Sequence, residues 1–427
     1  MKHPIRRIAP AAAMAVLCAA ALTAQPAAEK QEDTCVACHS ELEDELGRPA
    51  KMFQDDLHRK LGFSCADCHG GDAGSLDMEV SMSPSKGFLG KVSRRGIPEL
   101  CARCHSNAEL IHPFNPRQRV DQLALYRTSV HGKKLAQGDE QVATCIDCHG
   151  VHDIRPSSDT LSPVHPLRIP QTCAKCHADA EHMKAYSVPT TQFAEYETSV
   201  HWNALSARGD LSAPSCATCH GNHGAAPPGV NDVAQICGTC HVVFENAFKE
   251  SPHEQAFEDM GLRGCVTCHD NHAVQAADLG MLGVAEGAVC ADCHSEGEDA
   301  YTVAAGMRTR LDELSTALRD AREVLDRAEE AGMEISEGRL QWSDANEQLI
   351  RASVQVHTFR VEPVEEIAAA GLKVAQDARQ AGFDALDEKE FRRKGLGLSL
   401  ITIAFVIAGL ILAIRGLDQE TAKSDST

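Results

Sequence analysis

Nine copies of the pentapeptide Cys-x-x-Cys-His account for 18 of the 19 cysteines in this chain of 427 residues. In c-type haem attachment, the two thiols form thioethers with the haem vinyl groups and the adjacent histidine becomes the proximal iron ligand. A shuffled chain of this composition would contain roughly 0.04 copies of the pattern. The motifs therefore predict nine covalently attached haem c groups. The predicted attachment residues are Cys35, Cys38, Cys65, Cys68, Cys101, Cys104, Cys145, Cys148, Cys173, Cys176, Cys216, Cys219, Cys237, Cys240, Cys265, Cys268, Cys290 and Cys293. The predicted proximal ligands are His39, His69, His105, His149, His177, His220, His241, His269 and His294.

Other uses of paired cysteines explain this array poorly. A zinc ribbon needs four ligands in a tetrahedron and has no reason to place histidine after every second cysteine. A thioredoxin-like pair would occur once, and structural disulfides would not repeat the histidine. Covalent haem is the interpretation that accounts for both cysteines and the histidine of every motif.

Further histidines recur at fixed places around the motifs. His58, His131, His201 and His253 precede the second, fourth, sixth and eighth motifs, in the segments Asp-Leu-His, Ser-Val-His, Ser-Val-His and Ser-Pro-His. His152, His223 and His272 follow the fourth, sixth and eighth motifs, whereas Asp72 takes that place after the second. We expect the upstream histidines to be distal ligands of even-numbered haems and the downstream histidines to bind neighbouring haems.

The supply of histidines just suffices for nine haems with two histidine ligands each. Nine are proximal, His3 lies at the N-terminus, and 11 of the 21 remain for the distal positions. Beyond the seven of the repeat, His112 and His182 are predicted ligands, whereas the roles of His165 and His357 are left open. Met183 is an alternative thioether ligand, although a packed methionine is the simpler interpretation.

Composition excludes several classes of protein. A formal net charge of −20 does not suit a protein that binds nucleic acid, which needs a basic surface. Aromatic residues make up only 4% of the chain, and residues 35–297 provide about 29 residues for each haem, too few for independent cores. We therefore expect a mostly α-helical and irregular domain with little β structure, packed around its haems and unable to fold without them.

Both ends of the chain carry apolar segments. Residues 1–24 have the basic start, apolar stretch and small residues of a signal peptide, with cleavage expected between residues 21 and 28. Residues 395–414 contain no charge over 20 residues, which is long enough for a transmembrane helix. Three basic residues, Arg392, Arg393 and Lys394, lie on the haem-domain side of this segment, so the positive-inside rule alone would place that domain in the cytoplasm. A large exported domain, however, translocates largely regardless of flanking charge. We expect single-pass anchoring in the cytoplasmic membrane, an extracytoplasmic haem domain and a cytoplasmic tail at 415–427.

Residues 298–394 differ from the haem region. They lack cysteine, are rich in Ala, Glu, Arg and Leu, and space their apolar residues as amphipathic helices do. We expect helices over 298–331 and 336–360, separated near Gly332, and a third helix with Pro363 in its first turn. These helices would serve as a stalk or brace, or as an oligomerisation surface.

The nine motifs, with the Ser-Val-His and Cys-His-Gly-x-His segments, resemble the multihaem cytochromes c with doubled CXXCH motifs, related to the low-potential bis-histidine cytochromes. Over residues 35–294, this resemblance implies electron transfer through stacked low-spin haems. The segment Val356-His357-Thr358-Phe359 is similar to the C-terminal helices of pentahaem nitrite reductases and octahaem hydroxylamine oxidoreductases. Membership of those families would imply an open haem position, often with a proximal lysine, yet every motif here ends in histidine.

Two functions are compatible with these features. In the first, the chain carries electrons between a quinol-oxidising membrane subunit and a soluble or surface redox acceptor, and stand-alone catalysis is not expected. In the second, it is an oxidoreductase of a small nitrogen or sulfur oxyanion with one five-coordinate haem, which the degenerate first repeat favours. A structural haem subunit of a respiratory complex is a third interpretation.

Overall fold

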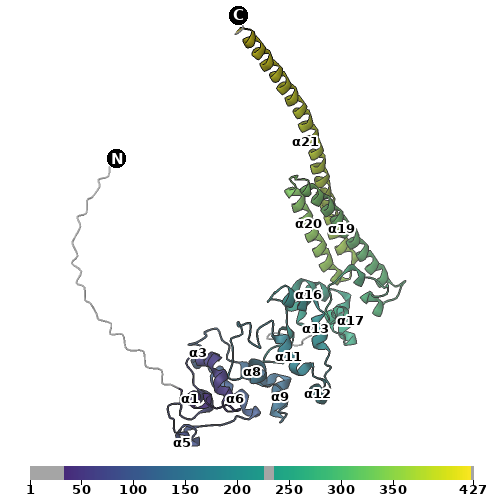
Figure 1. Ribbon diagram of the computed structural model, residues 1–427. Coiled ribbons are helices and arrows are strands. Elements are labelled where there is room, and N and C mark those ends of the chain that lie inside the picture. Colours follow the sequence, from purple (N-terminus) through teal and green to yellow (C-terminus); the bar gives the residue numbers. More distant parts are fainter. Residues whose placement is uncertain (1–32, 226–234, 425–427) are drawn as a thin grey trace, which may run out of the picture. The chain divides into compact units, whose positions relative to one another are not determined.

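The computed structural model describes residues 33–225 and 235–424, so the predicted signal peptide lies outside the described residues. Within these ranges the chain forms helices and turns, with no β-strand (Figure 1), which confirms the predicted fold class. It divides into two compact units. The first contains the described residues up to Ser93 together with Val151–Ile154, and the second contains Arg94–Gly150 and the residues from Arg155 onward.

Short helices and turns make up the first unit, and most span only one or two turns. They are α1 (Thr34–Ser40), α2 (Arg48–Met52), η1 (Phe53–Asp55), α3 (Leu57–Lys60), α4 (Cys65–His69), α5 (Met78–Ser81) and η2 (Pro84–Lys86).

The haem-motif region of the second unit is built in the same way. Its elements are η3 (Arg94–Gly96), α6 (Ile97–His105), α7 (Ala108–Ile111), α8 (Gln122–Thr128), α9 (Val130–Ala136), α10 (Cys145–His149), α11 (Ile169–His177), α12 (Ala180–Met183), η4 (Lys184–Tyr186), α13 (Gln192–Glu197), α14 (Val200–Trp202), η5 (Asn203–Ala207), α15 (Cys216–His220), η7 (Cys237–Thr239), α16 (Val242–Lys249), α17 (Pro252–Met260), α18 (Gly264–His269), η8 (Leu279–Met281) and η9 (Val289–Asp292).

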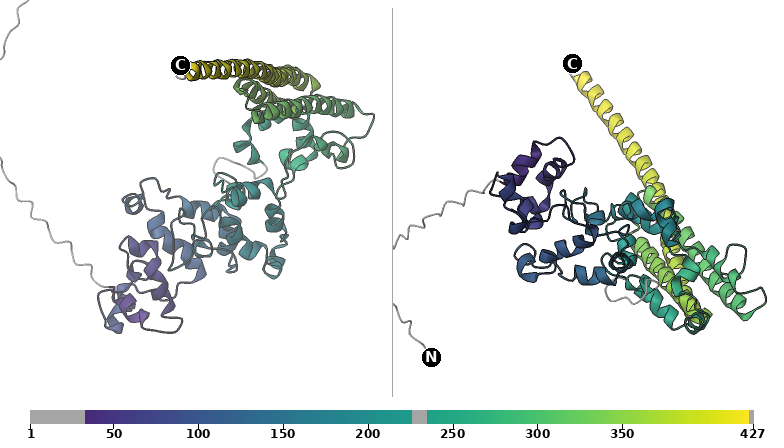
Figure 2. Two further views of the ribbon diagram at one scale, coloured as in Figure 1. Left: turned by 45° about the horizontal axis from the view of Figure 1, so that its top comes forward. Right: turned by 90° about the horizontal axis from the view of Figure 1, so that it is seen from below.

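Three long helices follow and pack side by side as a bundle (Figures 1 and 2). Helix α19 (Asp299–Glu330) ends at a turn in which Gly332 adopts a positive φ of 76°, at the predicted break. Helix α20 (Ser336–Gln355) continues into the short helix η10 (Val356–Thr358). Helix α21 (Val361–Ser424) then runs without interruption through the predicted membrane segment.

The two clusters of buried apolar side chains that the described residues form both lie in this bundle. Met307, Leu311, Leu314 and Val364 are almost fully buried in the larger one, and Leu325 belongs to the smaller one. By contrast, the haem-motif region buries only scattered apolar residues. This contrast agrees with the expectation that haem must provide the missing core of residues 35–297.

The compact units do not follow the boundary predicted at residues 297 and 298. Helix α16 of the haem-motif region packs against α20 and η10, and η8 packs against α19, so the bundle and residues 155–297 belong to one unit. The sequence boundary marks a change in composition, whereas the structural units follow packing.

The C-terminal part of α21 is apolar and exposed to solvent in the isolated chain. It is the one candidate membrane span among the helices of the described residues, and none of its most apolar window is buried. Exposed apolar residues along a whole helix suit a lipid environment.

A single substitution in the bundle core tests how its stability arises. Leu314 is fully buried, so Leu314→Ala should lower the free energy of unfolding of the bundle by about 3 kcal/mol because it leaves a cavity. Leu340 on α20 is 62% exposed, and Leu340→Ala should change that free energy by less than about 0.5 kcal/mol. Denaturant unfolding of the haem-loaded protein, followed by the far-ultraviolet helical signal, measures both. Equal effects of the two substitutions would contradict this description of the core.

Candidate haem-binding sites

Within the described residues, seven of the motif histidines face a second histidine from elsewhere in the chain. In every pair the ring centroids are between 6.0 and 6.4 Å apart, although the angle between the ring planes varies from 4° to 87°. The pairs are His69 with His152, His177 with His131, His149 with His223, His241 with His201, His220 with His272, His294 with His253, and His269 with His357.

This constant separation fits a shared iron atom. A metal–imidazole bond is about 2 Å long and the ring centroid lies roughly 1 Å beyond the nitrogen, so two rings on opposite sides of one metal are about 6 Å apart. Rotation about the bond axis is free, which explains the variable angle. Rings that merely packed together would favour a few tilts and a wider range of distances. The residues present therefore fit bis-histidine haem.

Hydrogen bonds at Nδ1 orient several of the motif histidines and of the histidines that face them. The Nδ1 atom lies 3.0 Å from the Gly90 carbonyl oxygen in His69, 3.2 Å from the Val354 carbonyl oxygen in His357 and 3.0 Å from the Leu46 carbonyl oxygen in His39. A carbonyl oxygen can only accept, so Nδ1 carries the proton and Nε2 keeps its lone pair for a metal.

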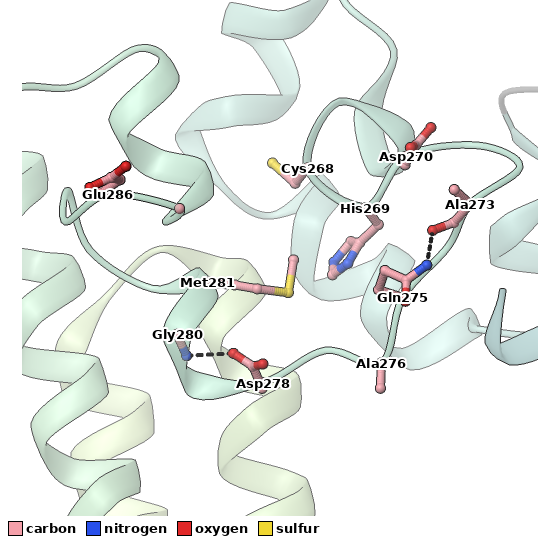
Figure 3. Close-up of a pocket in the computed structure, with 11 residues that line it drawn as sticks. Cys268, His269, Asp270, Ala273, Gln275, Ala276, Asp278, Gly280, Met281 and Glu286 are labelled. Atoms are coloured by element: carbon pink, nitrogen blue, oxygen red, sulfur yellow. Dashed lines mark hydrogen bonds between the residues drawn. The ribbon is translucent and has the colours of Figure 1, made fainter. Parts of the chain in front are cut away.

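A cavity of about 440 Å³ lies at the eighth motif (Figure 3). Cys268 and His269 line it, together with Met281 on η8. A thiol and an imidazole from one motif are the groups that attach a c-type haem, and Met281 adds an apolar wall. The cavity therefore combines the groups that attach a c-type haem with open space beside them.

The pairing follows a register that differs from the sequence prediction. The upstream histidines were expected to bind even-numbered haems, but His131, His201 and His253 lie opposite the fifth, seventh and ninth motifs. Each starts a short helix capped by a buried serine, and that helix presents the histidine to the next motif along the chain rather than to its own.

The downstream histidines make the complementary set of pairs. His152, His223 and His272 each lie opposite the motif two positions before the one they follow. No later repeat can serve the eighth motif, and His357 from η10 takes that place. Sequence reasoning left His357 open, because the sequence offers His272 beside the eighth motif and only the structure shows that His272 lies opposite the sixth.

The remaining predicted ligands have other surroundings. His112 uses Nε2 in a hydrogen bond of 3.1 Å to the Gln118 carbonyl oxygen, and the His182 ring lies 5.9 Å from the Tyr186 ring. Among the described residues, neither ring forms a pair with a motif histidine at the separation of the seven pairs. His58 lies in the first unit, and His105 is the last residue of α6 in the second unit. His165, for which no role was assigned, is buried and its Nδ1 accepts a hydrogen bond from the Leu167 amide.

His39 of the first motif does not belong to the seven pairs. Among the residues that the structure describes, no histidine ring lies opposite it at the separation seen in the seven pairs. Each paired odd-numbered motif takes the histidine that precedes the motif before it.

The cysteines place consecutive motifs next to one another. In three places the first cysteines of consecutive motifs are close neighbours, which joins the third motif to the fourth, the fifth to the sixth and the seventh to the eighth. These pairs are Cys101 with Cys145, Cys173 with Cys216, and Cys237 with Cys265. The second cysteines continue the series, because Cys148 lies near Cys176, Cys219 near Cys240, and Cys268 near Cys290.

In the first unit, Asp33 joins the first two motifs. Its carboxylate accepts hydrogen bonds from the Cys35 amide at 3.0 Å and, through its other oxygen, from the Cys65 amide at 3.0 Å. Burial and then the charge of Asp33 raise the pKa of the Cys35 thiol to about 11 and that of Cys65 to about 12. One carboxylate therefore caps the helices of two neighbouring motifs.

The carboxylate of Asp56, beside the predicted ligand His58, is held by three polar contacts. Its Oδ1 accepts from the His58 amide at 2.7 Å and lies 2.9 Å from His58 Nδ1, while Oδ2 accepts from the Ile154 amide at 2.7 Å. Burial would raise the pKa of Asp56, but these hydrogen bonds outweigh it and hold the pKa below its ordinary value. The carboxylate thus ties His58 to the segment that carries His152.

Burial of the ring pairs predicts sensitivity to acid. Desolvation lowers the pKa of His131, His149, His152, His220 and His223 below the ordinary value of 6.5, and a bound iron would require the same neutral imidazoles. A group whose folded-state pKa is lowered stabilises the fold above its unfolded pKa, and this stability is lost as the pH falls through the folded value. The melting temperature should therefore be constant between pH 8 and 7 and fall below about pH 6.5. A melting temperature that stays constant down to pH 5 would contradict this assignment.

Comparisons with known proteins agree with the site geometry. Residues 57–178 match the family model of cytochrome c3, and residues 258–299 match the model of the doubled CXXCH motif. The cytochrome c-type protein NrfB of Escherichia coli O6:H1 is 26% identical over 176 residues, which cover 37% of this chain and 78% of that protein. No solved structure matches the chain with significance. With the motifs and the paired histidines, these matches support a multihaem cytochrome c that binds haem c through CXXCH motifs and transfers electrons.

Proposed function

We propose that this chain is a membrane-anchored cytochrome with nine haems that conducts electrons along its length, between a quinol-linked membrane partner and another redox protein. The observation that carries the proposal is the contact between consecutive motifs. From the third motif to the ninth, each motif is a neighbour of the next through its cysteines, and Asp33 joins the first to the second. Haems attached to those cysteines would follow one another in chain order.

Paired histidines suit conduction rather than substrate chemistry. Bound haem supplies a one-electron couple at each motif. Residues of this chain fix the two imidazoles on either side, and backbone carbonyls hold rings such as His69 and His357 in one orientation. A rigid ligand pair changes little between oxidation states and leaves no position for a substrate. The net charge of −20 disfavours the arrival of electrons and should lower the potentials.

The bundle would hold the haems away from the lipid. Helix α21 starts at Val361, four residues after His357, and its apolar segment starts near Gly395. At a rise of 1.5 Å per residue, the 34 residues between them span about 50 Å. The eighth haem would then lie far from the membrane along this helix, so a quinol-oxidising partner must bring its own redox centre to the haem domain.

The proposed orientation places the haem domain on the periplasmic or extracytoplasmic side. Support comes from the predicted signal peptide, from the need to attach haem c outside the cytoplasm, and from the single candidate span. Protease added to intact cells with a permeabilised outer layer should degrade the haem domain and spare the tail at 415–427. A protected haem domain would contradict the orientation without affecting the electron-transfer function.

A potentiometric titration with optical detection tests conduction directly. We expect nine haems by pyridine haemochrome and a broad reduction wave that lies mostly below zero millivolts, as expected for neighbouring bis-histidine haems that share charge. Nine potentials well above zero millivolts would contradict the proposal.

A second candidate function rests on His39. If the first haem has no histidine opposite His39, its iron has an open position, and the chain would be an oxidoreductase of a small nitrogen or sulfur oxyanion with one five-coordinate haem. Glu43, Asp44 and Glu45 line a groove at this end of the first unit and oppose anions, although Arg48 and Lys51 line it too. A high-spin signal that nitrite or cyanide removes would favour this function, and its absence would reject it.

A further inference from the structure

The first repeat differs from the others at the residue that caps the helix of its upstream histidine. Asp56 takes this place, whereas Ser129, Ser199 and Ser251 take it in the later repeats. All four residues are buried, at 1%, 7%, 2% and 7% relative exposure respectively. A serine cap adds no charge, so only the first repeat buries a carboxylate beside its histidine.

This carboxylate reaches the ring as well as the backbone. The distance from Asp56 Oδ1 to His58 Nδ1 is 2.9 Å, and the Asp56 side chain is only 2% exposed. A carboxylate that accepts a hydrogen bond from the Nδ1–H group makes the imidazole a more basic ligand through Nε2. This stabilises the higher oxidation state of a metal.

Two other carboxylates approach predicted ligands but are much more exposed. The Glu298 carboxylate lies 3.1 Å from His294 Nδ1 with its side chain 50% exposed, and the Glu195 carboxylate lies 3.6 Å from His272 Nδ1 with its side chain 42% exposed. Water screens such charges, so their effect on an iron should be small. Among the described residues, Asp56 is the buried carboxylate in contact with a predicted ligand.

We propose that Asp56 is a positioning residue that lowers the reduction potential of the haem bound by His58 and makes it one of the lowest in the chain. The inference rests on the proposed function, with His58 as the distal ligand that the sequence predicts. Electrons would leave this haem readily, so the first repeat would set a low-potential end of the conduit.

The same contact also aligns a second ligand. Asp56 Oδ2 accepts from the Ile154 amide, and the Leu57 amide donates to the Ile154 carbonyl oxygen at 2.8 Å, which holds the segment that carries His152. In the third repeat, the Val200 amide donates to the Val274 carbonyl oxygen at 2.9 Å in the equivalent way, so Ser199 is the structural counterpart of Asp56. Exchanging the two cap residues therefore provides a matched pair of variants.

The experiment compares Asp56→Ser, Asp56→Asn, Ser199→Asp and Glu298→Gln in the full-length protein, by potentiometric titration monitored with low-temperature EPR. Asp56→Ser should raise the potential of one low-spin haem, with its equilibrium constant for reduction increased about tenfold, or about 59 mV for one electron. Asp56→Asn keeps an acceptor for His58 but removes the charge, and it should raise the same potential. Ser199→Asp should lower the potential of a different haem, and Glu298→Gln should have little effect.

His58→Ala separates failure of this inference from failure of the ligation. If that variant loses one low-spin haem while both Asp56 variants leave every potential unchanged, the inference is wrong and the ligation stands. If His58→Ala keeps all low-spin haems, His58 is not a ligand and the inference is also overturned. If the Asp56→Ser variant loses haem, the potentials of the more conservative Asp56→Asn variant decide whether the inference holds.

Discussion

Replacing His357 with alanine should convert one low-spin haem into a high-spin haem that binds carbon monoxide when reduced. The His357 ring lies 6.1 Å from that of His269, and the Phe244 ring lies 5.2 Å from the His357 ring and restricts its position. Alanine removes the imidazole and offers no other ligand, so the sixth position of the eighth haem opens. Low-temperature EPR of the oxidised protein and carbon monoxide difference spectra of the reduced protein measure the change.

His112→Ala is the matched control. This histidine was a predicted ligand, but its Nε2 is hydrogen-bonded to the Gln118 carbonyl oxygen, so its removal should leave every haem in its original spin state. If His112→Ala creates a high-spin haem and His357→Ala does not, the pairing described by the structure is wrong at the eighth motif.

Chain produced without haem attachment should lose nearly all its structure between residues 35 and 297 and keep the helices of the bundle. The haem-motif helices are only one to three turns long, and short isolated helices are marginal in water. The buried apolar clusters of the described residues lie within α19, α20 and α21, which need no cofactor to pack. Hydrogen exchange followed by peptide mass analysis should find protected amides only in the bundle.

The same measurement on the haem-loaded protein provides the control. There, amides of helices such as α11 and α15 should be protected because haem fills the space around them. Protection of these helices in the haem-free chain would show that protein packing alone holds them, and would contradict the role assigned to haem as core.

Most of what could be predicted about this protein from sequence came from the spacing of residues that are close to one another in the chain. The CXXCH spacing is itself the chemistry of attachment, so the motifs could be recognised without a fold. Gly332 and Pro363 mark limits of the long helices, α19 and α20 begin and end close to the expected places, and α21 begins where expected but continues to Ser424, beyond the predicted end of the membrane segment at residue 414. The 20 uncharged residues from Gly395 likewise indicate the candidate membrane span.

The pairing of ligands could not be predicted because it depends on tertiary contacts. His131 lies 14 residues before Cys145 and 42 before Cys173, and proximity in sequence favoured the nearer motif. The direction of α9 brings it to the farther one. His357 and Asp56 were missed for the same reason, since their partners lie 88 and 98 residues away in the sequence.

A count of haems together with low-temperature EPR of the oxidised, purified protein tests the central claim most directly. The pyridine haemochrome assay should give nine haems, and at least the seven whose motif histidines are paired should be low-spin. A high-spin haem, if one occurs, should be the one attached at Cys35 and Cys38. Fewer than seven low-spin haems in protein that holds all nine would contradict the bis-histidine conduit.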